Sequence, residues 1–114
     1  MLETIVGNRN AFYCLLFLYH YGEVYPSIIA KGLDEKTLTP IRLQLRRLEE
    51  GGIIKGRKVG RATMYSFNER STIVKHLREI VKIEYDNIQP KEKEKLFSVR
   101  SRPRRAGKPV ISGN

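Results

Sequence analysis

The strongest constraint on the fold is an uninterrupted apolar run over residues 11–19. Asn8 or Asn10, just before it, can cap a helix, because an asparagine side chain accepts a free backbone N–H of the first turn. Gly22 is typical of the residue that follows a helix. The sequence therefore predicts a helix over 11–21 that is apolar on every face, and such a helix has to be surrounded.

A chain of 114 residues offers few elements to surround this helix. Neighbouring helices or a second subunit could cover it, and we expect the second subunit. The run of nine apolar residues is less than half of the roughly 20 that a bilayer-spanning helix needs, so we expect no membrane segment. No basic segment precedes it, which argues against a secretory signal.

The chemistry-bearing residues are sparse. A single cysteine, Cys14, excludes an internal disulfide and a multi-thiolate metal site, and it favours a reducing, cytoplasmic location. His20 and His76 are isolated, and the sequence shows no Asp/Glu pair at a plausible catalytic site, no phosphate-binding glycine loop and no nucleophile–base set. We therefore expect no enzyme, no metal site and no cofactor.

The net charge of +10 is concentrated in two segments. Residues 42–61 carry seven basic and two acidic side chains, and residues 91–114 carry eight basic and two acidic ones. Concentrated positive charge favours a polyanion, and nucleic acid in particular, over a membrane surface or an acidic protein. We expect a folded domain over 1–90 and a basic, disordered tail over 91–114.

Two helices are predicted after the first. Pro26 suits the first turn of a short helix over 26–31. Thr39, as an N-cap, and Pro40, as the first helical residue, indicate a helix over 40–50. Its apolar residues recur at helical spacing on one inward face: Ile41, Leu45 and Leu48.

A β-hairpin is predicted next, from strands over 53–57 and 62–67. Gly60 lies in their connection and can adopt the positive φ that a tight turn requires. Tyr65 and Phe67 lie two residues apart on one face of the second strand, so we expect both in the core.

A long helix is predicted over 70–87, capped by Asn68 or Ser71. One face is apolar with a single polar break at Glu84, and consists of Ile73, Leu77, Ile80, Val81, Glu84 and Ile88. We expect this face and helix 11–21 to form the interface of a homodimer.

One short stretch of sequence makes the predicted order of helices and strands distinctive. Residues 45–54 read Leu-Arg-Arg-Leu-Glu-Glu-Gly-Gly-Ile-Ile, and they precede Gly60-Arg61 and Tyr65-Ser66-Phe67. Over residues 11–85 this resembles the winged helix-turn-helix of ArsR/MarR-type transcriptional regulators. Their recognition helix ends in Leu-x-x-Leu-Glu-x-x-Gly-hydrophobic, and a Gly-Arg wing and a Tyr-x-hydrophobic strand follow.

Two positions depart from that pattern. The spacing from Ala30 to Ile41 is eleven residues, one more than is usual in a helix-turn-helix. Asp34 stands where a turn glycine is common. Both affect the connection between the second and third helices, and neither affects the wing.

The resemblance implies a mainly α fold with a small β-hairpin: a three-helix core, a two-stranded wing and a long C-terminal helix. It implies a homodimeric transcriptional regulator that binds double-stranded DNA sequence-specifically, with helix 40–50 in the major groove and hairpin 53–67 as the wing. The alternative is a winged-helix interaction module, or a nonspecific DNA-binding component of a transcription, replication or chromosome-organising complex.

The outward face of helix 40–50 carries the candidate DNA contacts. Because such a helix docks by its N-terminus, the candidate base readers are Thr39, Arg42, Leu43 and Gln44. The candidate phosphate contacts on the helix are Arg46 and Arg47. At the hairpin tip, reaching flanking phosphates or the minor groove, they are Arg57, Lys58 and Arg61.

Alternatives stay open for three of these features. Leu43 could pack against a neighbouring helix instead of touching a thymine methyl. The cations of the hairpin could protect an exposed edge strand against aggregation. The cations of the tail could form an accessory arm on DNA or a nonspecific extension: Arg100, Arg102, Arg104, Arg105 and Lys108.

Overall fold

The computed structural model describes residues 1–98. Within them the protein is mainly helical, with one small antiparallel sheet of strand order β1-β3-β2. The elements are α1 (Leu2–Val6), α2 (Arg9–Tyr21), β1 (Glu23–Val24), α3 (Pro26–Gly32), α4 (Thr39–Glu50), β2 (Ile54–Val59), β3 (Ala62–Phe67), α5 (Thr72–Asp86) and α6 (Pro90–Leu96). None of these helices combines the length and hydropathy that crossing a bilayer requires.

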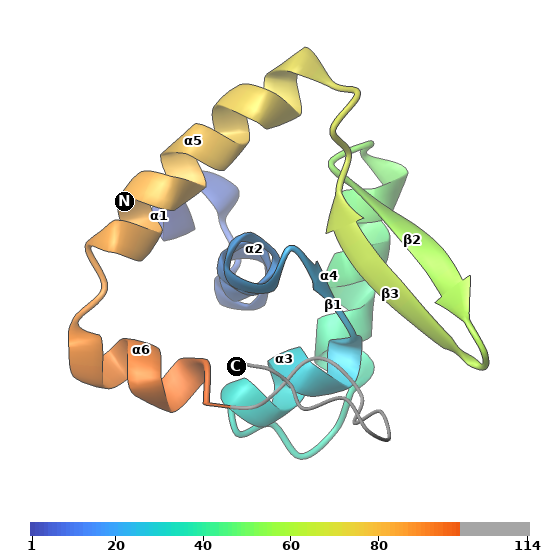
Figure 1. Cartoon of the computed structure of the whole chain (residues 1–114), viewed down its shortest axis with the longest axis horizontal. Helices are drawn as coiled ribbons and strands as arrows, with labels where there is room; N and C mark the ends of the chain where they lie inside the picture. The colour runs from blue at the N-terminus through green and yellow to red at the C-terminus, as the bar shows by residue number, and fades with distance from the viewer. Residues whose placement is uncertain (99–114) are drawn as a thin grey trace, which may run out of the picture.

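Helix α2 is the centre of the fold. Figure 1 shows it almost end-on, encircled by the other helices and the sheet. Every side chain from Cys14 to Leu18 is at most 2% exposed within this single chain. The expectation that a second subunit covers helix 11–21 was therefore wrong. The elements that cover α2 belong to the same chain. They include two short helices, α1 near the start of the described residues and α6 near their end.

The ends of the helices follow the capping signals with one exception. The Asn8 side chain accepts a hydrogen bond from the Ala11 N–H at 2.9 Å, and Gly22 ends α2 with a φ of 81°. The Ser71 hydroxyl accepts from the Val74 N–H at 3.2 Å and starts α5. Thr39 is not the N-cap of α4 as expected but its first residue, since the helix begins one position earlier.

The connection from α3 to α4 turns at Asp34, which has a φ of 59°. Among residues 1–98 it is the only non-glycine residue with positive φ. The Glu35 N–H then donates to the Ala30 carbonyl at 2.8 Å and closes the turn. Asp34 thus takes up the left-handed conformation for which glycine is common at this position.

The sheet has three strands rather than the expected two. β2 and β3 form the predicted hairpin, and Gly60 in its turn has a φ of 63°. The strand that the sequence did not predict is β1, which pairs Glu23 with Ser66 and Val24 with Tyr65. The sheet buries Val24, Ile54 and Phe67 against the helices.

Helix α5 has two apolar faces, not the single face expected. Val74 and Val81 are buried against the core. Ile73, by contrast, is 74% exposed and Ile83 is 61% exposed, and Ile80 is also exposed. Residues seven apart drift by about 20° on an α-helix, so Ile73 and Ile80 lie side by side on the outer face.

The basic segment 91–114 begins as helix α6 rather than as disordered chain. Behind it, the Phe97 ring packs on Phe17 at 4.9 Å and stacks on His20 at 4.2 Å between ring centroids. Burial, followed by the charge of Lys93, lowers the pKa of His20. Residues 99–114, which include the five tail cations, lie outside the described part of the chain.

We expect Gly32→Ala to destabilise the fold. A Cβ at Gly32 would lie 2.4 Å from Cζ of Phe17 and 2.5 Å from the Leu96 carbonyl oxygen, so α6 would have to shift. Overpacking of this kind costs about 1–3 kcal/mol of unfolding free energy, measurable by urea denaturation. The control is Gly51→Ala, whose Cβ would meet nothing closer than 3.5 Å. Equal stability of the two variants would contradict this packing.

Candidate nucleic-acid interface

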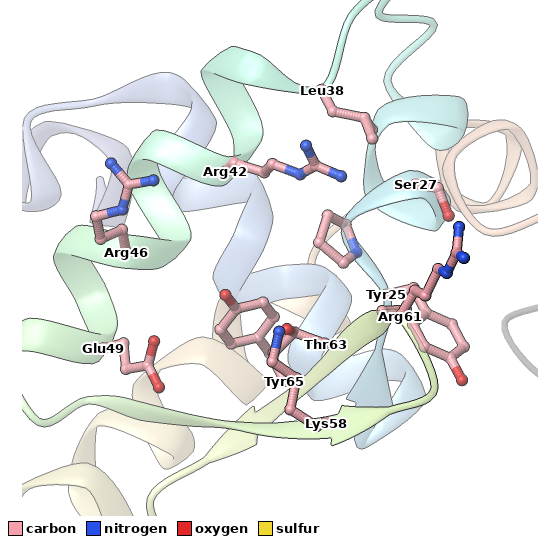
Figure 2. A pocket seen from close by; sticks show the side chains of 12 residues that line it. Tyr25, Ser27, Leu38, Arg42, Arg46, Glu49, Lys58, Arg61, Thr63 and Tyr65 are labelled. Atoms are coloured by element: carbon pink, nitrogen blue, oxygen red, sulfur yellow. The ribbon is translucent and has the colours of Figure 1, made fainter.

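A groove of about 590 Å³ separates helix α4 from the hairpin, with the start of α3 at one end. We call it the cationic groove. Figure 2 shows four cationic side chains from two elements around it: Arg42 and Arg46 from α4, and Lys58 and Arg61 from the hairpin. The full lining is Tyr25, Pro26, Ser27, Leu38, Arg42, Arg46, Glu49, Lys58, Arg61, Ala62, Thr63 and Tyr65.

The helical wall of the groove follows from the period of α4. Ile41 and Leu45 are fully buried and fix this helix against α2 and the core. Arg42 and Arg46 are one turn apart, so their side chains share a face. That face is exposed and turned toward the hairpin.

The hairpin wall follows from the alternation of the strands. Lys58 pairs with Thr63 across the hairpin, and Gly56 pairs with Tyr65 on the same face. Two positions further along is the buried pair of Ile54 with Phe67. One face of the hairpin is therefore core at its base and groove wall toward its tip.

The four groove cations have no intramolecular neutralisation within residues 1–98. The structure shows no ion pair and no hydrogen bond from the side chains of Arg42, Arg46, Lys58 or Arg61 to any described residue. Glu49 is the one acidic residue in the lining. The groove therefore concentrates positive potential that an anion can satisfy.

Tyr65 is a groove residue rather than a fully buried core residue, and Phe67 alone of the two lies in the core. Figure 2 shows the Tyr65 ring between the hairpin and α4. Burial raises the pKa of Tyr65, as does the charge of Glu49, while Arg46 and Arg42 act in the opposite direction. Its hydroxyl is therefore neutral at physiological pH and can donate a hydrogen bond.

Arg57 does not join the other candidate residues. Its Nη2 donates to Oε1 of Glu23 at 3.0 Å, in an ion pair that reaches across β3 to β1. Because Arg57 and Lys58 are consecutive in a strand, they point to opposite faces. The expectation that Arg57 acts with Lys58 and Arg61 is corrected: it faces away from the groove.

Gln44 is also placed differently from expectation. Its side chain is only 6% exposed, and its Oε1 accepts a hydrogen bond from Nη1 of Arg47 at 2.8 Å. Gln44 comes three residues after Ile41, within the apolar stripe, so the period of the helix turns it inward. Gln44 is thus not available as a base reader, and instead it holds the guanidinium of Arg47.

The remaining candidates of α4 lie on the exposed surface outside the groove lining. Thr39 and Arg47 are exposed. Leu43 is 49% exposed, so it does not pack against a neighbouring helix. Thr39 and Leu43 thus share the outward surface near the start of the helix with Arg42.

For several residues that line the groove, no local sequence pattern predicted a place at the site. Tyr25 and Ser27 reach the groove because α3 starts beside the hairpin, which is a long-range contact. Thr63 could have been found from its strand partner Lys58. Glu49 belongs to the Leu-Glu string, but nothing local indicated that it reaches the strands.

Residues 1–98 contain no group of three His, Cys, Asp or Glu side chains that could hold a metal ion. Cys14 is buried, and burial raises the pKa of its thiol to about 12. Its thiol is therefore protonated and unreactive in the folded protein at neutral pH.

Comparison with known proteins gives no family for this chain. No protein-family model matches it, and no curated protein matches it in sequence. Its function therefore has to be inferred from the groove and the surfaces beside it.

We expect Gln44→Ala to lower the free energy of unfolding by about 1–3 kcal/mol, because it removes a buried side chain and its hydrogen bond. Arg42→Ala, on the exposed face of the same helix, should change it by less than about 0.5 kcal/mol. Urea denaturation followed by circular dichroism compares the two. A Gln44→Ala variant as stable as the wild type would contradict the buried position.

Proposed function

We propose that this protein is a sequence-specific double-stranded DNA-binding transcriptional regulator with a winged helix-turn-helix fold. It acts as a homodimer, with α4 in the major groove and the β2–β3 hairpin as the wing. The observation that carries the proposal is the convergence of four unpaired cations, from α4 and the hairpin, on one groove.

Helix α4 has the shape and the surface for the major groove. A helix with its side chains is about 10–12 Å across, which matches a major groove about 12 Å wide. Its exposed N-terminal surface presents Thr39, Arg42 and Leu43. A guanidinium can pair with O6 and N7 of guanine, and an aliphatic side chain can contact the methyl group of thymine.

The cationic groove suits the sugar–phosphate backbone beside that helix. Arg46, Lys58 and Arg61 supply charge to phosphate oxygens, which contributes affinity without reading sequence. The hydroxyls of Ser27 and Thr63 line the same groove and can donate to phosphates. The wing then lies along the flank of the site, with Lys58 and Arg61 near its tip.

The homodimer is proposed on the outer face of α5, since α2 is enclosed in its own chain. Ile73, Ile80 and Ile83 are exposed there, and Ile5 of the neighbouring helix α1 is exposed too. Grouped exposed apolar side chains are typical of interaction surfaces. A two-fold dimer would present two copies of α4 to half-sites about one helical turn apart.

Binding to duplex DNA should depend strongly on salt. With three or four phosphate contacts per subunit, the log of the affinity should fall against log salt with a slope of roughly −5 to −7. Arg61→Ala removes one groove cation from each subunit of the dimer and should reduce the magnitude of that slope by about 2. Arg57→Ala is the matched control on the opposite face of the hairpin and should leave it unchanged. Fluorescence anisotropy measures all three.

A flat salt response would contradict DNA binding by this groove. Sequence specificity is tested by selecting bound duplexes from a random pool, in which we expect an inverted repeat. If the selected duplexes share no consensus sequence, the protein is a nonspecific DNA-binding component rather than a sequence-specific regulator. An absence of DNA binding would favour the interaction module.

We expect Ile83→Glu to dissociate the dimer, because it would bury a charge at the interface. Ile83 is largely exposed in the single chain, so its free energy of unfolding as a monomer should change little. Sedimentation equilibrium should give the mass of two chains for the wild type and of one chain for the variant. Lys91→Glu, on α6, is the control. A monomeric wild type at micromolar concentration would contradict the dimer.

A further inference from the structure

Among the described residues that line the cationic groove, the single acidic side chain is hydrogen-bonded to the hairpin. Glu49 lies in the last turn of α4, and its Oε2 accepts a hydrogen bond from the Gly56 N–H of β2 at 3.1 Å. β2 is an outer strand of the sheet, so this N–H points away from β3 and toward the helix. Within residues 1–98, this is the only side-chain hydrogen bond from α4 to a strand.

Gly56 is a position where a side chain of α4 reaches the backbone of β2. A Cβ there would lie 2.8 Å from Cγ2 of Thr63, 3.0 Å from Cε1 of Tyr65 and 3.2 Å from Oε2 of Glu49. A side chain of any size would therefore push these groups apart. Because Gly56 has no Cβ, the side chain of Glu49 in α4 can approach the backbone of β2.

The base of the hairpin is held by other contacts, so Glu49 acts further toward its tip. The Ile53 N–H donates to the Leu48 carbonyl at 2.9 Å, and Nδ2 of Asn68 donates to the Gly52 carbonyl at 2.9 Å. Beyond these, the strands run past the open groove toward Gly60. The Glu49–Gly56 bond therefore joins α4 to the hairpin beyond its base, whereas the pairing of β3 with β1 and the Arg57–Glu23 ion pair hold the opposite side of the hairpin.

We propose that Glu49 is a positioning residue for DNA binding: its hydrogen bond to Gly56 sets the width of the cationic groove. This rests on the proposed function. The carboxylate itself repels a polyanion, because it brings negative charge into the groove. Its hydrogen bond favours binding indirectly, by holding Lys58 and Arg61 at a fixed distance from Arg42 and Arg46.

The charge of Glu49 weakens DNA binding and its hydrogen bond strengthens it, so variants that separate the two test the proposal. Glu49→Gln keeps an oxygen acceptor for the Gly56 N–H but removes the charge, whereas Glu49→Ala removes both. Glu50 is the matched control, because it is the adjacent carboxylate and is exposed. Among residues 1–98 its side chain has no hydrogen bond or ion pair. Glu50→Gln and Glu50→Ala therefore change charge alone.

Affinity for duplex DNA is measured by fluorescence anisotropy for all four variants. We expect Glu49→Gln to bind at least as tightly as the wild type. Glu49→Ala should bind about 25-fold more weakly than Glu49→Gln, which is about five-fold, or about 1 kcal/mol, for the hydrogen bond lost in each of the two subunits. The two Glu50 variants should bind equally to one another. Equal affinities of Glu49→Ala and Glu49→Gln would overturn the proposal.

Hydrogen exchange in the free protein gives a second readout that needs no DNA. By NMR, the Gly56 amide should exchange slowly in the wild type and in Glu49→Gln, and at least about ten-fold faster in Glu49→Ala. The Ile53 amide, bonded to Leu48, should not change. An unchanged Gly56 amide in Glu49→Ala would overturn the positioning role alone. A wild type that binds no duplex DNA would instead overturn the proposed function together with it.

Discussion

Burial of α2 is the constraint on which the other elements depend. A helix apolar on every face cannot border water, so the remaining elements enclose it on all sides (Figure 1). Ile41 and Leu45 dock α4 against this centre, and that docking fixes which face of α4 turns outward. The exposed arginines of α4 are thus a consequence of how α2 is covered. The short helices α1 and α6 complete the cover, which makes a second subunit unnecessary for it.

The cationic groove combines two periodicities. α4 has about 3.6 residues per turn, so Arg42 and Arg46 lie on a different face of the helix from the buried Ile41 and Leu45. In the hairpin, the two-residue alternation places Lys58 on the groove face and Arg57 on the other, where Glu23 neutralises it. Four like charges left unpaired around one groove oppose folding through their mutual repulsion. A bound polyanion would relieve that repulsion, which is why we propose that the groove binds nucleic acid.

Local signals predicted α2, α4, the hairpin and α5, because caps, glycines and apolar spacing act within a few residues. Sequence reasoning also named Arg42, Arg46, Lys58 and Arg61, which the structure brings together around one groove. It did not find β1, a two-residue strand made by pairing with distant β3, and so missed the ion pair that removes Arg57 from the site. The amide of Gln44 was read as polar and outward, although its place in the helical period is inward. The sequence pattern placed Ile73 and Ile80 on one face with the buried Val81, because residues at helical spacing cannot show which of two neighbouring faces meets the core.

The most direct test of a DNA-binding face built from α4 and the hairpin is to map amide shifts in NMR spectra of the ¹⁵N-labelled protein, titrated with short duplex DNA at low salt. We predict that shifts concentrate in the N-terminal half of α4 and near the hairpin tip, around Lys58 and Arg61. The exposed residues of α6 should be unaffected. Shifts confined to α5 and α6, or no shifts at all, would contradict this assignment.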